Sequence, residues 1–339
     1  MAFERLGRAG VVTLTRPKAL NAITHAMISA LARALDAWEA DAEVAVVIVK
    51  GEGRAFSAGG DILQVYNAGK AGRPTVEFFA DEYRLNARIR RFRKPYVSLI
   101  DGIVMGGGVG ISCHGSHRAM TENATFAMPE VGIGFFPDIG GSYILPRLKG
   151  EFGMFLALTG HRIRRGDACW AGLATHTVDA AALPAIVEAL CESGEPDAVL
   201  KAHGAAAARE TDEATVHLIN RHFAPAELSG VVASLEGATG DDGFAARTLA
   251  TLRSRSPTSL AVTFRQIRAG AMLSMEECMV MEYRILNRMV RGHDFYEGIR
   301  AALIDKGSTP RWEPERLEEV DPAAVETYFA PPPGGDLAP

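Results

Sequence analysis

The first groups of this chain that could do chemistry are the backbone N–H groups of its glycine-rich loops. Glycines are dense in three segments, 59–60, 106–108 and 132–141. Glycine weakens the interior of a helix or strand, so such clusters mark unusual backbone angles or close approach of a ligand. In 58–61 and 106–110 the glycines stand where a helix is expected to begin. Their N–H groups, backed by the positive end of a helix, could bind a developing negative oxygen.

Other uses of glycine-rich loops fit the sequence less well. The run 106–110 approaches the dinucleotide pattern G-x-G-x-x-G, but its third glycine comes one residue early, and no G-x-x-x-x-G-K-[ST] phosphate loop occurs. Ser112 does not complete the G-x-S-x-G elbow of serine hydrolases, and it falls within an expected helix. His114 and His117 are interpreted as surface or core histidines rather than as catalysts or metal ligands.

Hydrophobic patterning indicates the elements that must position these loops. Short apolar runs rich in β-branched residues predict strands at 11–15, 44–49, 96–100 and 118–121. Helices are predicted from the N-cap Thr24 to about 40, from Asp61, over about 75–92, and over 105–114. Strand, glycine-rich loop and helix therefore recur three times in the first 120 residues, which is typical of an α/β fold with ligand-facing loops at strand ends.

The second half of the chain has a different character. Residues 195–245 are rich in Ala, Asp and Glu, show weak strand signals and are predicted to be helical. Residues 246–305 carry strong apolar stripes and are also predicted to be helical. The proline- and glycine-rich stretch 331–335 predicts a disordered tail.

Composition narrows the class of protein. The 339 residues, 47% hydrophobic and 23% charged, suit one large domain with an appendage or two domains. The net charge of −5 gives no expected footprint for nucleic acid or a membrane surface. Against that balance the basic run 88–94 has two interpretations, the solvated end of a helix or a contact for phosphate groups of a ligand.

Cysteine usage and apolar runs predict a compartment. The four cysteines form no C-x-x-C pair, so neither a disulfide framework nor a zinc ribbon is expected. No apolar run approaches the roughly 20 residues that span a bilayer. The N-terminus has no signal-peptide pattern. We therefore expect a reduced, cytoplasmic protein.

Five ordered motifs resemble the crotonase (enoyl-CoA hydratase/isomerase) superfamily, over roughly residues 5–190. They are the segments 16–22, 54–62, 101–110, 126–141 and 158–160. Further segments are similar to the 3-hydroxyisobutyryl-CoA hydrolase branch of that superfamily and extend the resemblance nearly to the C-terminus. They are 79–83, 105–115, 135–138, 256–260, 282–284 and 294–306.

The resemblance implies a fold and its division. The fold would be a crotonase-like spiral of repeated ββα units with a helical C-terminal region. The spiral core with its CoA and oxyanion site would occupy residues 1–190. A helical insertion would follow at 191–245, a C-terminal cap or oligomerisation region at 246–330, and a disordered tail at 331–339.

The resemblance also implies an oxyanion hole and substrate contacts. The N–H groups of Gly60 and Gly107 would bind the oxygen of a CoA thioester. Ala58 and Lys18 would contact the CoA ester, Lys18 from the N-terminal segment that packs on CoA in the family. Gly60 and Gly107 could instead be ordinary turn glycines.

Three carboxylates and one glycine distinguish the branch. Glu130 occupies the position of the family's catalytic glutamate, and Asp138 and Glu82 match further polar positions of the hydrolase branch. Gly110 replaces the second catalytic glutamate of hydratases. Alternatives from the residues alone are a helix-start carboxylate for Glu130, a turn aspartate for Asp138, and an ion pair with a nearby arginine for Glu82. The helical phase places Glu82 on an apolar stripe, where burial should raise its pKa unless it is paired.

The implied activity is hydrolysis of a short 3-hydroxyacyl-CoA. The substrate of the branch is 3-hydroxyisobutyryl-CoA, cleaved to 3-hydroxyisobutyrate and CoA in valine catabolism. The alternatives are a hydratase or isomerase of the same fold and a non-catalytic CoA-ester binder. CoA would enter as part of the substrate, with no metal or other cofactor. The family resemblance also implies a homo-oligomer, a trimer or a hexamer. From the charge and the apolar runs, no nucleic-acid or membrane partner is expected.

Overall fold

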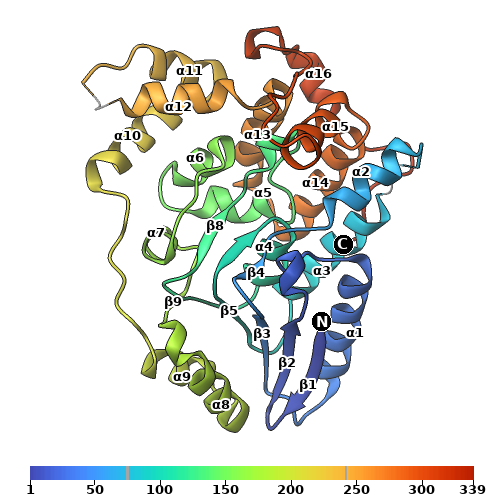
Figure 1. The fold of residues 1–339 in the computed structure, drawn as a ribbon, viewed down its shortest axis with the longest axis vertical. Coiled ribbons are helices and arrows are strands. Elements are labelled where there is room, and N and C mark those ends of the chain that lie inside the picture. The colour runs from blue at the N-terminus through green and yellow to red at the C-terminus, as the bar shows by residue number, and fades with distance from the viewer. Residues whose placement is uncertain (74–75, 241–242) are drawn as a thin grey trace.

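Two sheets form the centre of the computed structural model, which describes residues 1–73, 76–240 and 243–339 (Figure 1). The larger has the order β1-β2-β3-β5-β7-β9, from β1 (Ala2–Leu6), β2 (Ala9–Leu14), β3 (Val46–Gly51), β5 (Tyr96–Ile100), β7 (His117–Met120) and β9 (His176–Thr177). The smaller has the order β4-β6-β8, from β4 (Ala55–Ser57), β6 (Ile103–Met105) and β8 (Thr125–Ala127). Only β1 runs antiparallel to its neighbour, among the described strands.

Successive units place one strand in each sheet and then return through a helical element. The helical elements are α2 (Ile62–Lys70) and α3 (Glu77–Arg90) after β3 and β4, α4 (Gly107–Ser112) after β5 and β6, and the 3₁₀ turn η2 (Glu130–Ile133) after β7 and β8. This arrangement confirms the predicted spiral of ββα units. The sequence analysis missed the small sheet because its strands have three residues each, too few to show a period.

The larger sheet is buried on both faces, which explains its continuous apolar runs. On one face Val12 and Val49 pack in the cluster that includes Leu31 of α1 (His25–Ala40). On the other, Val11 packs in the cluster that includes Ile186 of α8 (Leu183–Ser193). The Thr24 cap of α1 is confirmed, because its hydroxyl accepts a hydrogen bond from the N–H of Met27.

Most of the predicted boundaries agree with the structure to within a few residues. The helix predicted over about 75–92 is α3, and position 75 lies outside the described residues. Additional 3₁₀ turns are η1 (Pro17–Ala19), η3 (Leu145–Arg147), η4 (Ala180–Ala182) and η6 (Leu317–Glu319). All four cysteines are unpaired.

The middle of the chain is helical but interrupted. Its helices are α5 (Gly141–Ile144), α6 (Phe152–Thr159), α7 (Arg165–Ala171), α9 (Pro196–Ala202), α10 (Glu213–Phe223) and α11 (Leu228–Glu236). Figure 1 shows a long irregular connection between α9 and α10 along the side of the core. It is fastened where the Asp167 carboxylate accepts hydrogen bonds from the N–H groups of Glu210 and Thr211. The prediction of a helical 195–245 is therefore wrong for this connection, and positions 241–242 lie outside the described residues.

The predicted C-terminal helices are confirmed, and they lie together over one end of the spiral (Figure 1). They are α12 (Phe244–Arg253), α13 (Pro257–Gly270), α14 (Met275–Met289), α15 (His293–Ile299), the π-turn η5 (Arg300–Ile304) and α16 (Pro322–Thr327). The structure differs from the prediction at the tail, which is packed: Asp336 pairs with Arg284 at 2.6 Å and Leu337 is buried. These contacts supply the ordering that composition alone did not indicate.

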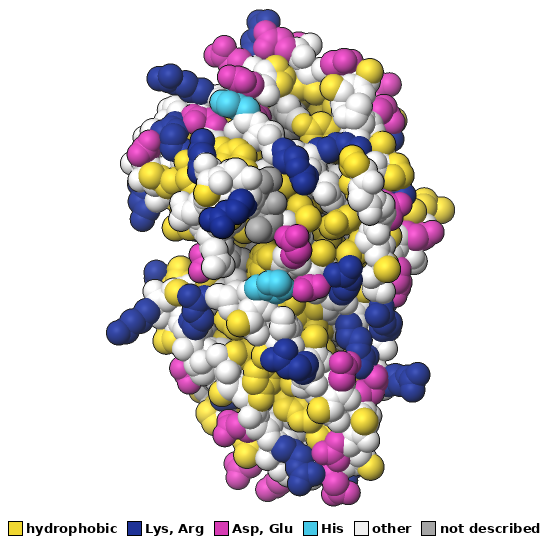
Figure 2. Space-filling view, turned by 90° about the vertical axis from the view of Figure 1, so that its right-hand side faces the viewer, with side chains coloured by type: hydrophobic (Ala, Val, Ile, Leu, Met, Phe, Trp, Pro, Cys, Tyr) yellow, Lys and Arg dark blue, Asp and Glu magenta, His cyan; other side chains and the backbone are white. Residues whose placement is uncertain are grey.

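Acidic and basic side chains are interspersed over the face shown in Figure 2, with apolar side chains between them. Across residues 1–73, 76–240 and 243–339, no helix combines the length and apolarity required to cross a membrane.

Candidate functional site

A cavity of about 140 Å³ lies where the loops after the small sheet meet the middle of α3. Its walls come from four stretches of the chain that are distant in sequence. They include Ala58, Gly59, Gly60, Phe78, Glu82, Gly106, Gly107, Glu130, Phe135 and Asp138. The cavity therefore brings together every predicted site residue except Lys18.

The two glycine loops approach one another closely across this cavity. Gly106 has a φ of +47°, and a methyl group there would lie 3.0 Å from the Cα of Gly59. A methyl group on Gly107 would lie 3.2 Å from the Gly60 nitrogen and 2.7 Å from Glu82 Oε1. Gly107 also begins α4, where N–H groups have no partner within the helix. Side chains at these positions would close the gap between the loops.

The N-terminal segment supports the first loop from behind. The N–H of Ala58 donates to the Leu20 carbonyl at 2.9 Å, and the buried side chain of Asn21 donates to the Ala55 carbonyl at the same distance. Lys18 belongs to this segment, in η1, and its side chain is exposed outside the cavity lining. The structure therefore places Lys18 in the segment that supports the first glycine loop, and not in the wall of the cavity.

Glu82 projects from the buried face of α3. It is 1% exposed, and its Oε1 has no hydrogen-bond partner among the described residues. The arginines of α3 have other partners. Arg84 pairs with Asp81 and Arg88 with Glu39, and Arg90 donates to the Tyr143 hydroxyl. The alternative of a structural ion pair for Glu82 is therefore not seen in the described part of the chain.

Glu130 and Asp138 complete the carboxyl cluster. Glu130 is the first residue of η2, as the helix-start alternative expected, yet its Oε2 is buried without a partner in the described chain. The Asp138 carbonyl accepts from the Gly141 N–H in a turn, as its alternative expected. Its side chain nevertheless enters the site, where Oδ2 accepts a hydrogen bond from the Tyr83 hydroxyl at 2.8 Å.

Burial sets the protonation of this cluster. Loss of hydration raises the pKa of Glu82 and of Glu130 well above the usual value, and the nearby Asp138 charge raises both further. Burial also raises the pKa of Asp138, to about 7, although the Tyr83 hydrogen bond lowers it in part. A negative charge in the ligand-free site is therefore held most easily on Asp138.

The loop after Asp138 is strained and is held from several sides. Ile139 has a φ of +51°, which is unfavourable for a β-branched residue. Its carbonyl accepts from His114 Nε2 at 2.7 Å. The carboxylate of Glu282, on α14, accepts from the N–H groups of Gly140 and Ser142 at 2.9 and 3.0 Å. These contacts fix the backbone that carries Asp138.

The sequence analysis did not assign roles to Tyr83 or Glu282. Glu282 is completely buried on the apolar face of α14, between Cys278 and Ile285. Glu82 showed the same signal, a carboxylate on an apolar stripe, so the pattern that identified Glu82 would also have found Glu282. His114 is a core histidine, as predicted, and Ser112 is buried within α4.

Asn86 occupies the space beside Gly110, the position at which hydratases carry their second catalytic glutamate. A methyl group on Gly110 would lie 2.7 Å from the side-chain nitrogen of Asn86, which is completely buried one turn along α3 from Glu82. A longer side chain at position 110 would require Asn86 to move. The close packing of α3 on α4 thus depends on glycine here.

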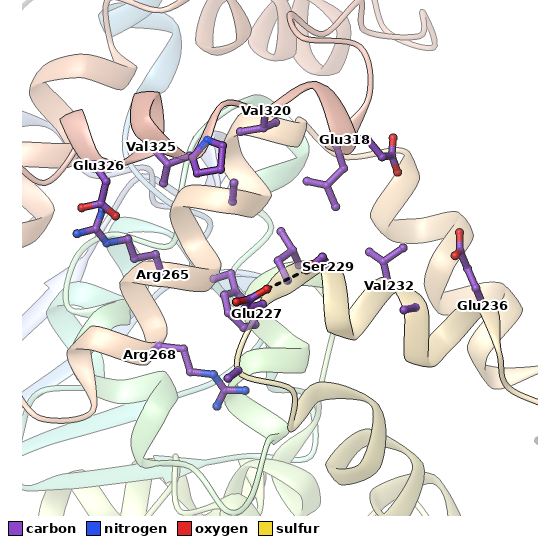
Figure 3. Close-up of a pocket in the computed structure, with 17 residues that line it drawn as sticks. Glu227, Ser229, Val232, Glu236, Arg265, Arg268, Glu318, Val320, Val325 and Glu326 are labelled. Atoms are coloured by element: carbon purple, nitrogen blue, oxygen red, sulfur yellow. Dashed lines mark hydrogen bonds and ion pairs between the residues drawn. The ribbon is translucent and has the colours of Figure 1, made fainter.

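A larger cavity, of about 800 Å³, lies elsewhere, between α11, α13 and α16 (Figure 3). Most of its charged groups already have partners: Arg265 pairs with Glu326, Glu236 pairs with Arg253, and Glu227 accepts a hydrogen bond from Ser229. Arg268 pairs with Glu151 at 3.0 Å. Its walls are otherwise mainly apolar, and it combines no glycine loops with buried carboxyl groups. The chemistry therefore favours the smaller cavity as the candidate active site.

Comparisons with known proteins agree with this geometry. Residues 9–329 match the family model of the enoyl-CoA hydratase/isomerase family. A relative from Xenopus tropicalis, named 3-hydroxyisobutyryl-CoA hydrolase, mitochondrial, is 46% identical over 99% of this chain and 90% of its own length. Among solved structures, a carnitinyl-CoA dehydratase from Mycobacterium thermoresistibile has a TM-score of 0.92 and 40% identity, covering 98% of this chain and 97% of that one. An enoyl-CoA hydratase from Rhodobacter sphaeroides 2.4.1 has a TM-score of 0.89 and 39% identity, covering 99% of both chains.

The relatives bear on the compartment and on the family of this chain. The prediction of a cytoplasmic location is wrong, because relatives such as the one from Xenopus tropicalis are named as mitochondrial. Composition and reduced cysteines do not distinguish one reducing aqueous compartment from another. The fold, the glycine loops and the match over nearly the whole chain agree with one another: the chain belongs to the enoyl-CoA hydratase/isomerase family.

Proposed function

We propose that this chain hydrolyses 3-hydroxyisobutyryl-CoA to 3-hydroxyisobutyrate and CoA. The observation that carries the proposal is the meeting of two glycine loops and three buried carboxyl groups in one cavity. The name of the Xenopus tropicalis relative, which aligns over 99% of this chain, supports the choice of substrate. No metal or other cofactor is part of the proposal.

Gly60 and Gly107 would supply the oxyanion hole. A thioester oxygen between the two loops would accept a hydrogen bond from each N–H as negative charge develops on it. Removing one such donor typically lowers the rate by ~10²–10³, so the pair would be a main source of rate acceleration. Ala58 would contact the CoA ester at the edge of this hole, and Lys18 would do so from η1.

Glu130 would act on the thioester carbonyl in one of two ways. As a nucleophile, its carboxylate oxygen would displace the CoA thiolate and form a mixed anhydride, which water then opens. As a general base, it would take a proton from water as the water oxygen attacks the carbonyl carbon. Both routes need an ionised Glu130, although burial favours its neutral form. A proton passed from Glu130 to a neighbouring carboxylate would meet that need.

Asp138 is the suited acceptor for that proton. Its pKa is raised only to about 7, whereas burial raises the pKa of Glu82 well above the usual value and so favours the neutral form of Glu82. Asp138 and Glu82 would then orient the substrate's 3-hydroxyl group or the attacking water. The two carboxyl groups differ because only Asp138 receives the Tyr83 hydrogen bond.

The test of this assignment is Glu130→Gln. We expect kcat to fall strongly and the KM for the CoA ester to change little. Asp167→Asn is a matched control, because it removes a buried carboxylate that lies outside the cavity. Near-complete activity of Glu130→Gln would show that the assignment is wrong.

Isotope labelling separates the two routes. A single turnover in H₂¹⁸O that places the label in the Glu130 carboxyl group would demonstrate the anhydride. A label confined to the released acid, with no reduced adduct on Glu130 after borohydride trapping, would support the general base.

Hydration of an enoyl-CoA is a second candidate, favoured by the names of the two similar proteins of known structure, a dehydratase and a hydratase. Against it, Gly110 lacks a carboxylate and Asn86 occupies the adjoining space. Thiol release from 3-hydroxyisobutyryl-CoA would indicate hydrolysis. Loss of enoyl absorbance from crotonyl-CoA without thiol release would indicate hydration, and binding without turnover would indicate a CoA-ester binder.

We propose a core at 1–190 that is extended by the segments 191–245 and 246–330, and a homo-oligomer that is a trimer or a hexamer. Sedimentation of the full chain would distinguish these assemblies from a monomer.

A further inference from the structure

A third cavity, of about 180 Å³, lies beyond the C-terminal end of α4, whereas the candidate active site lies at its N-terminal end. Arg90 and Arg147 line this cavity, and both are exposed. Their guanidinium carbons lie 5.3 and 3.8 Å from the centre of the Tyr143 ring, so the two cations are stacked on one aromatic side chain. Arg118, at β7, lines the cavity as well.

The positive charge at this cavity is not balanced. Within the described part of the chain, none of the three arginines forms an ion pair with an acidic side chain. Instead they bond to neutral groups: Arg90 to the Tyr143 hydroxyl, Arg118 to the carbonyls of Leu173 and Gly115, and Arg147 to carbonyls that include that of Tyr143. Guanidinium groups gathered around a cavity without counter-charge suit an anionic ligand.

The neighbours of Arg90 in the basic run 88–94 behave differently. Arg88 pairs with Glu39 at 2.6 Å, and Arg91 lies 3.7 Å from Glu276. The two interpretations of this run therefore apply to different residues. Arg88 and Arg91 are the paired, partly solvated end of a helix, whereas Arg90 is available to a ligand.

His114 also lines the cavity and gives it a second property. It is 2% exposed, and its Nε2 must carry a proton because it donates to the Ile139 carbonyl. Burial, together with the charges of Arg90 and Arg118, lowers the pKa of His114 to about 4. At neutral pH its Nδ1 is therefore an unprotonated acceptor, and it is buried without a partner among the described residues. A ligand that satisfies the site must supply a hydrogen-bond donor to Nδ1 and negative charge to the arginines.

We propose that this cavity binds a phosphate group that still carries a proton, as inorganic phosphate or as the singly ionised form of a phosphate monoester. Its ionised oxygens would accept hydrogen bonds from Arg90 and Arg147, and its P–OH group would donate to Nδ1 of His114. Sulfate carries the same dianionic charge but no proton at neutral pH, so it would present a lone pair to the lone pair of Nδ1. The coenzyme A molecule also carries a phosphate monoester, on its ribose.

The test is calorimetric titration of the full chain with inorganic phosphate at pH 7.5 and constant ionic strength. Arg90→Gln removes one charge-assisted partner and should weaken Kd about tenfold or more. Arg91→Gln is the matched control, because it removes the same charge one residue away and should leave Kd unchanged. Sulfate should bind to the unaltered chain more weakly than phosphate.

Titration with coenzyme A and with dephospho-coenzyme A distinguishes the two sources of phosphate. It is carried out at pH 6.0, where about half of a phosphate monoester still carries its proton. If the monoester of coenzyme A occupies the cavity, Arg90→Gln weakens binding of coenzyme A but not of the dephospho form. If free phosphate is the ligand, Arg90→Gln weakens phosphate binding alone. The proposal is overturned if no binding of phosphate is detected and Arg90→Gln leaves the Kd of coenzyme A unchanged. It is also overturned if Arg91→Gln raises Kd as much as Arg90→Gln does, or if sulfate binds as tightly as phosphate. Phosphate binding to Glu130→Gln should equal that of the unaltered chain, so failure here is separable from failure of the proposed hydrolysis.

Discussion

The hydrogen bond from Tyr83 to Asp138 should set the acidic limb of the pH–rate profile. The pKa of Asp138 is raised to about 7 by burial, and the Tyr83 hydroxyl at 2.8 Å lowers it from a still higher value. If the ionised form of Asp138 is needed for turnover, activity should rise with pH through a midpoint near 7. Tyr83→Phe removes a donor that favours the ionised form, so the midpoint should move to higher pH.

The size of the shift follows from the strength of the bond. A hydrogen bond to a charged group contributes about 1.5–3 kcal/mol, and 1.36 kcal/mol corresponds to one pKa unit. Part of that energy is retained when Asp138 is neutral, so we expect the midpoint to move up by roughly one pH unit. Activity measured at pH 6 should then fall about tenfold, while activity at pH 9 should change little.

The assay is thiol release from 3-hydroxyisobutyryl-CoA between pH 5 and 9. Tyr96→Phe is the matched control, because Tyr96 is also buried but donates to a backbone carbonyl, that of Ile111. It should lower stability without moving the midpoint. A Tyr83→Phe profile that keeps its midpoint, or moves it to lower pH, would refute the assignment of the acidic limb to Asp138.

Three further outcomes follow from other contacts. Asp138→Asn should stabilise the protein by up to about 4 kcal/mol at pH 8 and little at pH 4, because the Asp138 carboxyl group has a pKa of about 7 in the folded protein and ionises at lower pH in the unfolded chain. Equal gains in the free energy of urea unfolding at both pH values would contradict this. Gly110→Ala should lower the free energy of unfolding by about 1–3 kcal/mol, and Asn86→Ala in the same chain should recover part of that loss. Strictly additive effects of the two substitutions would exclude a close contact between positions 110 and 86. Glu282→Ala should lower kcat roughly 10–100-fold with a smaller change in KM, and Glu282→Gln should retain more activity. A kcat per folded molecule that is unchanged in Glu282→Ala would show that Glu282 only stabilises the fold.

Local pattern was sufficient to predict four of the six strands of the larger sheet, β2, β3, β5 and β7, and the helices α1 to α4, but not the edge strands β1 and β9. The apolar run at 44–49 and the stripe after Thr24 each encode their own structure, because burial requires those residue types at that spacing. The small sheet could not be found in this way, since β4, β6 and β8 gain their stability from pairing with one another. The ordered tail was missed for a related reason, because Asp336 is ordered by Arg284, which lies 52 residues away in the sequence.

The candidate site was predictable to different degrees in its parts. The glycine loops are visible in sequence because a backbone oxyanion hole excludes side chains, and that exclusion constrains residue type directly. The carboxyl groups were visible where they interrupt an apolar pattern, as Glu82 does on α3. Their pairing was not visible: neither the Tyr83 bond nor the opposition of Gly107 to Glu82 has a local signal, since each depends on how α3 packs against elements that follow it.

The helical region after residue 246 is part of the candidate site and not only an attachment to it. The left-handed conformation of Ile139 is of a kind that costs about 1–3 kcal/mol, and the 137–142 loop keeps it because the surrounding contacts offset that cost. Two of the residues that do so come from the C-terminal helices: Gln266 of α13 donates to the Pro137 carbonyl at 2.6 Å, and Glu282 of α14 accepts from Gly140 and Ser142. Without them the loop would be free to relax, and Asp138 would lose its fixed position beside Tyr83. The spiral core alone therefore contains the candidate catalytic residues but lacks the contacts that hold one of them in place.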